Sequence, residues 1–226
     1  MSRYMIEFSK TGTICYTSHL DLMKVFKRTF KKAGIKQAYS QGFNPHPKMG
    51  FAQPLSLGYW GLKELMEFET EEDYSPEYLE KKLRLMMPEG LEIIKCERLE
   101  GLKKTLAAIT EAAEYIIAIP LKEPLEMSGE EIKDKYLGQQ QIMALKKQKK
   151  KKELAEVDIK PMIRQIVFTP ETEALFITTV LDSGSVSNLS PELVIATLTK
   201  ALGIETDRSE IEVMRKEIYL KSDIIG

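Results

Sequence analysis

The residues best suited to chemistry lie in the first quarter of the chain. His19 and His46 are the only histidines among 226 residues, and Asp21 follows His19 by two positions. Imidazole exchanges protons near neutral pH, so the three side chains could act as acid and base in RNA cleavage. They could also bind a metal ion. In the alternative interpretation, the histidines are unrelated surface or capping residues. The distinction depends on whether His19, His46 and Asp21 converge in space.

His46 lies in a segment rich in glycine, proline and polar residues, from Tyr39 to Ala52. Two prolines flank it and restrict the residues before them to extended conformations, so the loop is stiff. Phe43 and Phe51 could stack on a base or simply pack in the core. The polar side chains expected to bind an anion or to form hydrogen bonds are Ser40, Gln41, Asn44, His46 and Lys48.

A helix is predicted to begin just before His19. Ser18 is a good N-cap, Asp21 lies three residues further on, and apolar residues recur at helical spacing until Gly34. Free N–H groups at a helix start attract anions, so Ser18 and His19 form a candidate phosphate site. The opposite face of the same helix is basic and is expected to lie in solvent; it carries Lys24, Lys27, Arg28, Lys31 and Lys32.

The net charge of −1 hides a separation of charge along the chain. Residues 10–50 contain eight Lys or Arg against Asp21 alone, whereas residues 61–100 contain six basic and twelve acidic residues. A second basic run, Lys146–Lys152, lies in a long connection between residues 139 and 160. Such a run is usually a solvated segment, but it could also contact phosphates. RNA is therefore the expected partner.

Composition restricts the class of protein. Hydrophobic residues make up 43% and charged residues 30%, which is typical of a globular chain. There is no long apolar run and no signal-peptide pattern, so we expect a cytoplasmic protein without membrane contact. Two cysteines exclude a cysteine-rich metal cluster. Since the chain also has no glycine-rich nucleotide signature and no nucleophile elbow, no cofactor and no bound metal are expected.

The order of expected elements favours an α+β fold of two tandem ferredoxin-like (βαββαβ) halves, residues 1–100 and 114–226. The first half is expected to contain strands at Arg3–Phe8, Gln37–Ser40, Met66–Thr70 and Leu91–Arg98, with helices from Ser18 to Gly34 and from Ser75 to about Met87. The second half is expected to contain strands at Glu114–Leu121, around Val167, at Leu175–Val180 and at Ile211–Leu220, with helices at Ser128–Tyr136 and Ser190–Leu202. Ser190-Pro191-Glu192 echoes Ser75-Pro76-Glu77, which suggests a tandem repeat. Residues 100–113 form the expected linker, which could itself be helical.

Three longer motifs carry a family resemblance: Tyr16-Thr-Ser-His-Leu-Asp-Leu-Met23, Tyr39-Ser-Gln-Gly-Phe-Asn-Pro-His-Pro-Lys48 and Pro54-Leu-Ser-Leu-Gly58. Asp158-Ile-Lys-Pro161 and the segment 184–191 are also similar. The chain resembles the radical-SAM-linked protein family, a bacterial domain of unknown function found beside, or fused to, radical SAM proteins. The resemblance implies a role in RNA or ribosome metabolism and a radical SAM partner. Cys15 and Cys96 cannot themselves hold the iron–sulfur cluster, which needs three closely spaced thiolates.

The expected function is an RNA-binding accessory protein that works with a radical SAM partner and is not an enzyme on its own. A histidine-dependent RNA-processing or RNA-modifying enzyme is the main alternative, and more weakly the fold resembles tandem ferredoxin-like RNA endonucleases. The third possible function is that of a protein adaptor, whose basic face binds an acidic partner. The sequence leaves the oligomeric state open.

Overall fold

The computed structural model describes residues 1–147 and 154–221 and shows a mixed α+β fold. The chain divides into two compact units, Met1–Glu111 with Arg215–Gly226, and Ala112–Met214. The last strand, β10 (Glu212–Leu220), is therefore shared between them. Within the described residues, no helix combines the length and apolar character needed to cross a membrane.

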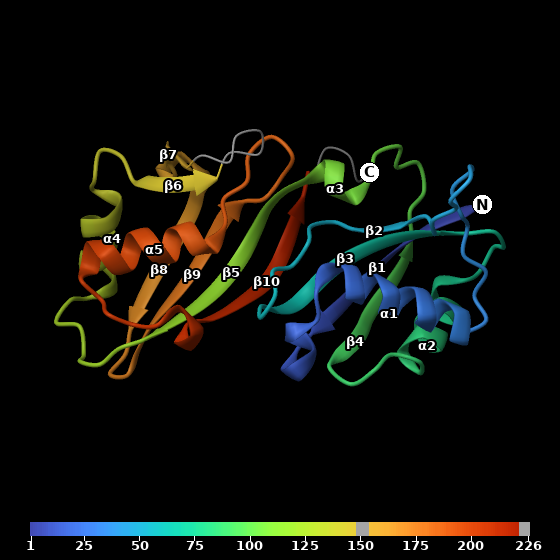
Figure 1. Ribbon diagram of the computed structural model, residues 1–226, viewed down its shortest axis with the longest axis horizontal. Helices are drawn as coiled ribbons and strands as arrows, with labels where there is room; N and C mark the ends of the chain where they lie inside the picture. Colours follow the sequence, from blue (N-terminus) through green and yellow to red (C-terminus); the bar gives the residue numbers. More distant parts are fainter. Residues whose placement is uncertain (148–153, 222–226) are drawn as a thin grey trace. The chain divides into compact units, whose positions relative to one another are not determined.

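The first unit is built on an antiparallel sheet with the strand order β4-β1-β3, and β2 also pairs with β3. Its elements are β1 (Ser2–Lys10), the short 3-10 helix η1 (Gly12–Tyr16), α1 (His19–Lys32), β2 (Met49–Phe51), β3 (Trp60–Thr70), α2 (Pro76–Arg84), β4 (Leu91–Arg98) and α3 (Leu106–Ile109). Figure 1 shows these elements in the blue and green part of the ribbon. The mixed α+β character expected for this half is confirmed, and both of its expected helices are present.

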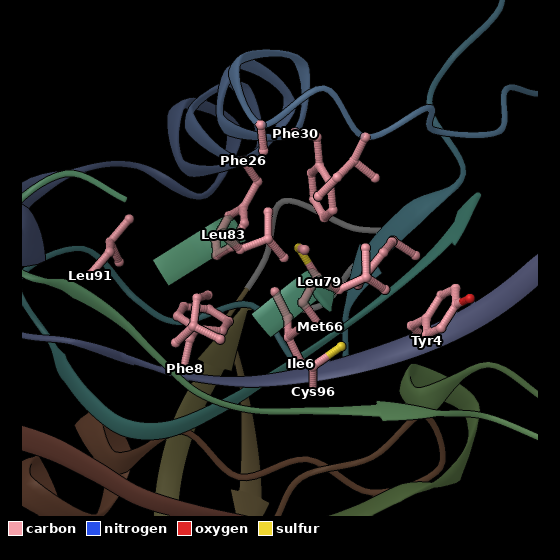
Figure 2. Close-up of a cluster of buried hydrophobic side chains, with 14 of the residues drawn as sticks. Tyr4, Ile6, Phe8, Phe26, Phe30, Met66, Leu79, Leu83, Leu91 and Cys96 are labelled. Carbon is pink, nitrogen blue, oxygen red and sulfur yellow. The ribbon is translucent and has the colours of Figure 1, made fainter. Parts of the chain in front are cut away.

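The core of the first unit lies between the sheet and the helices α1 and α2. Tyr4, Ile6 and Phe8 alternate along β1 and are all buried, because successive side chains of a strand point to opposite faces. Phe26 and Phe30 reach them from α1, as Figure 2 shows. Leu79 and Leu83 add the buried face of α2. The two helices therefore cover the same face of the sheet.

Two predicted strands differ from the structure. Residues 37–40 form no strand; Gln37 and Tyr39 make isolated bridges to Thr70 and Pro47. The expected strand at Met66–Thr70 is instead the end of the longer β3, which begins at Trp60. Polar and glycine residues in the first half of β3 hide the alternating pattern from the sequence.

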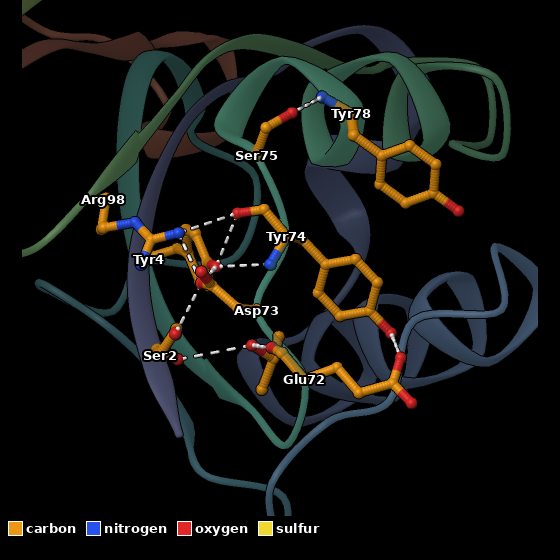
Figure 3. A network of polar contacts seen from close by, with 9 residues as sticks. Ser2, Tyr4, Glu72, Asp73, Tyr74, Ser75, Tyr78 and Arg98 are labelled. Atoms are coloured by element: carbon orange, nitrogen blue, oxygen red, sulfur yellow. Dashed lines mark hydrogen bonds and ion pairs between the residues drawn. The ribbon is translucent and has the colours of Figure 1, made fainter.

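The turn before α2 is held by a polar network around Asp73 (Figure 3). Its carboxylate accepts hydrogen bonds from the Ser2 and Tyr4 hydroxyls, at 2.8 and 3.1 Å, and forms an ion pair with Arg98. The Tyr4 hydroxyl shares its single proton between this carboxylate and the carbonyl of Tyr74, which is 2.8 Å away. These contacts join β1, β4 and the start of α2, which Ser75 caps.

The other face of the first sheet carries a smaller apolar cluster formed by Ala52, Leu65, Leu106, Ile109 and Ile218. Residues 100–113, expected to be a linker, contain α3 and the beginning of β5 (Thr110–Pro120). Leu106 and Ile109 of α3 are fully buried in this cluster. The part of this segment up to Glu111 thus belongs to the first unit, and the helix considered for the connection is present as α3.

The second unit contains the antiparallel strand order β5-β9-β8. Its remaining elements are α4 (Gly129–Leu137), β6 (Met143–Lys147), β7 (Leu154–Asp158), the 3-10 helix η2 (Lys160–Met162), β8 (Ile163–Pro170), β9 (Ala174–Asp182), α5 (Pro191–Leu202) and the 3-10 helix η3 (Arg208–Glu210). Ser128 and Ser190 cap α4 and α5 as expected.

The connection at residues 139–160 contains a feature that the sequence analysis missed, the separate two-stranded sheet of β6 and β7. Lys146 lies in β6, and its amine donates to the carbonyl of Asn188 at 2.8 Å. The expected phosphate contacts at Lys149–Lys152 lie outside the described residues.

Candidate nucleic-acid interface

The basic face of α1 is exposed as the helical spacing predicts. Leu22, Phe26 and Phe30 are buried on one side of the helix, which places the cationic side chains on the other. The exposed residues of this basic face are Lys24, Lys27, Arg28, Lys31 and Lys32.

Only part of this charge is neutralised by neighbouring carboxylates. Lys24 forms an ion pair with Asp21, with 2.9 Å between the amine and the carboxylate. Within the part of the chain that the structure describes, Lys27, Arg28 and Lys31 form no ion pair. The amine of Lys27 instead lies 5.8 Å from the centre of the Tyr39 ring. A cationic surface thus extends along α1 to the base of the loop that follows it.

That loop is closed by hydrogen bonds at its base. The backbone N–H of Ser40 donates to the carbonyl of His46 at 2.8 Å, and the N–H of His46 donates to the Ser40 hydroxyl at 3.0 Å. Tyr39 forms an isolated β-bridge with Pro47, one residue further from the tip on each side. Gly42 has φ 127°, a conformation that favours glycine. The tip between the closing pairs is exposed and includes Gln41, Phe43 and Asn44.

The two phenylalanines of this segment have opposite environments. Phe51 is only 8% exposed and packs on Phe8 and Phe26, with ring centres 5.8 and 5.7 Å apart. Phe43 has a relative exposure of 112%, so its ring has no packing role. Of the two aromatic side chains considered for base stacking, only Phe43 is accessible.

Lys48 lies where the loop returns to the sheet. Its amine is 2.8 Å from the carboxylate of Glu69, with both side chains partly exposed. Beside it is a hollow of about 420 Å³, which Arg3, Glu67 and Lys103 also line. Arg3 is paired with Glu67 there, so opposite charges alternate and the hollow is less suited to phosphate than the α1 face.

The start of α1 differs from the expected phosphate site. Ser18 caps the helix by accepting a hydrogen bond from the N–H of Asp21 at 3.2 Å. Its hydroxyl also donates to the Asp21 carboxylate at 2.7 Å. This hydrogen bond, together with Lys24, lowers the pKa of Asp21 below its usual value. A fixed negative charge therefore lies at the helix start and opposes the approach of an anion.

His19 and His46 have different surroundings. His19 is partly buried, and its ring lies 5.2 Å from the Phe51 ring, edge to face. Burial lowers the pKa of His19 below its usual value, which favours the neutral imidazole. His46 is exposed on the loop. No hydrogen bond or ring contact joins the two histidines, and residues 1–147 and 154–221 contain no group of three His, Cys, Asp or Glu side chains able to hold a metal ion.

A buried polar cluster beneath His19 was missed by the sequence analysis. Arg215 and Glu64, 1% and 3% exposed, are joined by two N–H···O contacts, of which the Nε–Oε1 contact is 2.8 Å. Lys10 donates to the carbonyls of Cys15 and Thr17, at 3.0 and 3.1 Å. Burial lowers the pKa of Lys10. The strand pattern could have placed Lys10 inside, since it continues the alternation of Tyr4, Ile6 and Phe8.

The buried cluster also encloses a cavity. It has a volume of about 10 Å³, close to the minimum for one water molecule, and is lined by Lys10, His19, Gln53 and Glu64 among others. Arg215 donates to the carbonyl of Gln53 at 2.7 Å. These contacts fix the segment that precedes α1 and the one that follows β2, and so they position His19 against Phe51.

Together, the fold and this surface define an α+β protein with an exposed cationic helix and an adjoining aromatic loop. The chain belongs to the family DUF2344, described as an uncharacterized protein conserved in bacteria, whose model matches residues 3–191. Membership of a bacterial family of unknown function confirms that part of the resemblance drawn from the motifs, and the link to radical SAM proteins stays a prediction. No curated protein matches the chain.

A solved structure is similar in fold. A chain in the crystal structure of a Cbf5-Nop10-Gar1 complex aligns with a TM-score of 0.54 and 13% sequence identity. The alignment covers 97% of this chain and 50% of that chain, so the protein spans about half the length of the structure it matches. At this identity the similarity concerns the fold alone.

Proposed function

We propose that this protein binds RNA through the basic face of α1 and the loop from Ser40 to His46, as an accessory to a radical SAM partner. The observation that carries the proposal is the row of exposed cationic side chains on α1, Lys27, Arg28 and Lys31, for which the described residues supply no carboxylate. Phosphates attract such a row, and release of counterions from the nucleic acid favours binding.

Several features support a nucleic acid over an acidic protein partner. The loop beside the helix presents amide side chains, an imidazole and an exposed aromatic ring, groups that recognise unpaired bases. An acidic protein could be bound by the positive charges of α1 alone, and these loop groups would have no role in its binding. The catalytic alternative has less support, because His19 is packed against Phe51 and Asp21 is bound to Ser18 and Lys24.

The strand order supports the tandem ferredoxin-like topology expected from the sequence. We propose that each half is a ferredoxin-like βαββαβ unit. In the first half β4 and β3 flank β1, with β2 on β3, and in the second half β9 lies between β5 and β8. These neighbours are those of a split βαβ arrangement with two helices on one face.

The radical SAM partner is proposed from the resemblance carried by the motifs, and the two cysteines of this chain are too few to hold the cluster themselves. Cys15 and Cys96 are both buried and free. Burial raises the pKa of the Cys96 thiol to about 12, so its thiolate is not available as a ligand. In this proposal the partner supplies the cysteines of the cluster. In this proposal the present chain contributes RNA binding.

RNA affinity measured against salt concentration tests the RNA-binding proposal. We expect a steep loss of affinity as salt rises, with each phosphate contact adding roughly 0.7–0.9 to the log–log slope. The variant Lys27→Glu/Arg28→Glu/Lys31→Glu should bind weakly and show a smaller slope, because it reverses the charge of the proposed surface.

The control variant carries the same change of charge elsewhere. Lys122, Lys135 and Lys200 are exposed residues of the second unit, and their replacement by Glu should reduce affinity much less. Circular dichroism would check that both variants are folded. Absence of RNA binding at low salt, or an equal loss in both variants, would refute the assignment to α1.

A further inference from the structure

We infer that the loop Ser40–His46 binds an unpaired base of single-stranded RNA by stacking it on Phe43, an inference that rests on the proposed RNA-binding function. The ligand class is thus a single strand rather than a duplex. Three features of the first unit carry the inference: the exposure of the ring, the closure of the loop and the continuity of the loop with the basic helix.

The exposure of Phe43 distinguishes it from the other phenylalanines of the first unit. Phe8, Phe26, Phe30, Phe51 and Phe68 are all buried, whereas Phe43 is fully exposed at the tip of its loop. Both faces of an exposed ring are open to a flat partner. A nucleobase has such a face whatever its identity, so stacking of this kind tolerates many sequences.

The loop holds the ring in place because its base is closed. The hydrogen bonds between Ser40 and His46, with the bridge of Tyr39 to Pro47, fix both ends of a short segment. Pro45 removes a further rotation next to the tip. A stiff loop loses little conformational entropy when a base binds, which favours stacking over collapse of the ring onto the surface.

The basic face of α1 can bind the phosphates of the same RNA strand next to the Phe43 loop. Tyr39 at the base of the loop contacts the amine of Lys27, and Arg28 and Lys31 continue the cationic row along α1. A strand whose base stacks on Phe43 can therefore place its backbone on the helix. In an RNA duplex the base faces are already stacked on one another, so the ring would have no partner.

Affinity for three oligonucleotides of one sequence tests the inference: single-stranded RNA, the RNA duplex and single-stranded DNA. Wild type should prefer single-stranded RNA to the duplex. Phe43→Ala should lower affinity for the single strand by about 5- to 150-fold, the range reported for loss of one stacked base, and leave duplex affinity unchanged. Since the ring is exposed, this variant should remain folded.

Two further variants separate stacking from simple apolar contact. Phe43→Leu keeps a comparable apolar volume without a ring and should behave like Phe43→Ala. Phe43→Trp should retain affinity, and its fluorescence should be quenched when a base stacks on it. The same titration of wild type, whose only tryptophan is Trp60, provides the background.

The outcomes distinguish the inference from the function on which it rests. Equal affinity for single strand and duplex, with sensitivity to reversal of Lys27, Arg28 and Lys31 retained, would overturn stacking but keep RNA binding. Absence of affinity for both RNAs at low salt would overturn both. Tighter binding of the DNA strand would overturn RNA as the ligand.

Discussion

His19 is held in a partly apolar environment, although it is the first residue of α1, whose basic face lies in solvent. Its ring lies against Phe51, and the cavity beside it is lined by Lys10 and Glu64. Burial lowers its pKa, so the folded protein favours the neutral imidazole. At neutral pH this residue therefore acts as a packing group, and cannot attract phosphate by charge.

A dependence of stability on pH follows from the lowered pKa of His19. The unfolded chain takes up the proton near pH 6.5, before the folded protein does, so the free energy of unfolding should be highest above pH 6.5 and fall as the pH drops towards the folded pKa. His19→Gln should remove this contribution to the pH dependence of the free energy of unfolding. Urea unfolding between pH 5 and 7.5 would measure the free energy of unfolding of both proteins. The same pH dependence in the variant as in wild type would contradict the role assigned to His19.

Residue types predicted part of the site and left part undetermined. Helical spacing alone placed Lys27, Arg28 and Lys31 in solvent, and the structure confirms their exposure. The sequence could not separate Phe43 from Phe51, because both belong to the segment 39–52 that was expected to be one loop. Burial of Phe51 depends on contacts with Phe8 and Phe26 from other elements. The Arg215–Glu64 pair joins residues 151 positions apart and has no local signature.

At the scale of elements, capping signals were reliable and strand limits were not. Ser18, Ser75, Ser128 and Ser190 each accept a backbone N–H at the start of the helix that follows. These interactions are local, so the sequence is sufficient to predict them. Strand pairing needs a distant partner. The region around Gln37–Ser40 makes only bridges, and the lysine-rich composition concealed the β6–β7 hairpin.

The packing of β10 beside β3 depends on the buried pair of Arg215 and Glu64. Replacing Arg215 by Leu leaves the Glu64 carboxylate buried without its partner, so we expect the free energy of unfolding to fall by about 3–5 kcal/mol. The double variant Glu64→Leu/Arg215→Leu should be less destabilised, because it leaves no buried charge. Guanidinium unfolding of the three proteins would measure both effects.

A value for Arg215→Leu within about 0.5 kcal/mol of wild type, the range typical of surface substitutions, would show that the pair has no such role. The double variant also controls for volume. If it were as unstable as the single variant, loss of packing and of the hydrogen bonds to Gln53 and Pro54 would account for the effect.

At the scale of the whole molecule, the proposed partnership is the main functional question. Co-expression with a candidate radical SAM protein should give a complex that elutes as one peak in gel filtration. The expected reason is that cluster chemistry and RNA binding reside on different chains. Two separate peaks at micromolar concentration would argue against a stable complex, and Lys27→Glu/Arg28→Glu/Lys31→Glu would show whether the basic face is the contact.

The sharing of β10 has a consequence for biosynthesis. Residues from Arg215 onwards belong to the first unit, although 103 residues of the second unit, Ala112–Met214, separate them from Glu111. A ribosome therefore completes the whole second unit before it delivers the partner of Glu64. Until then the nascent first unit lacks both the ion-pair partner of Glu64 and the strand that neighbours β3. Completion of the first unit therefore waits until β10 has been synthesised, and the order of folding need not follow the order of synthesis.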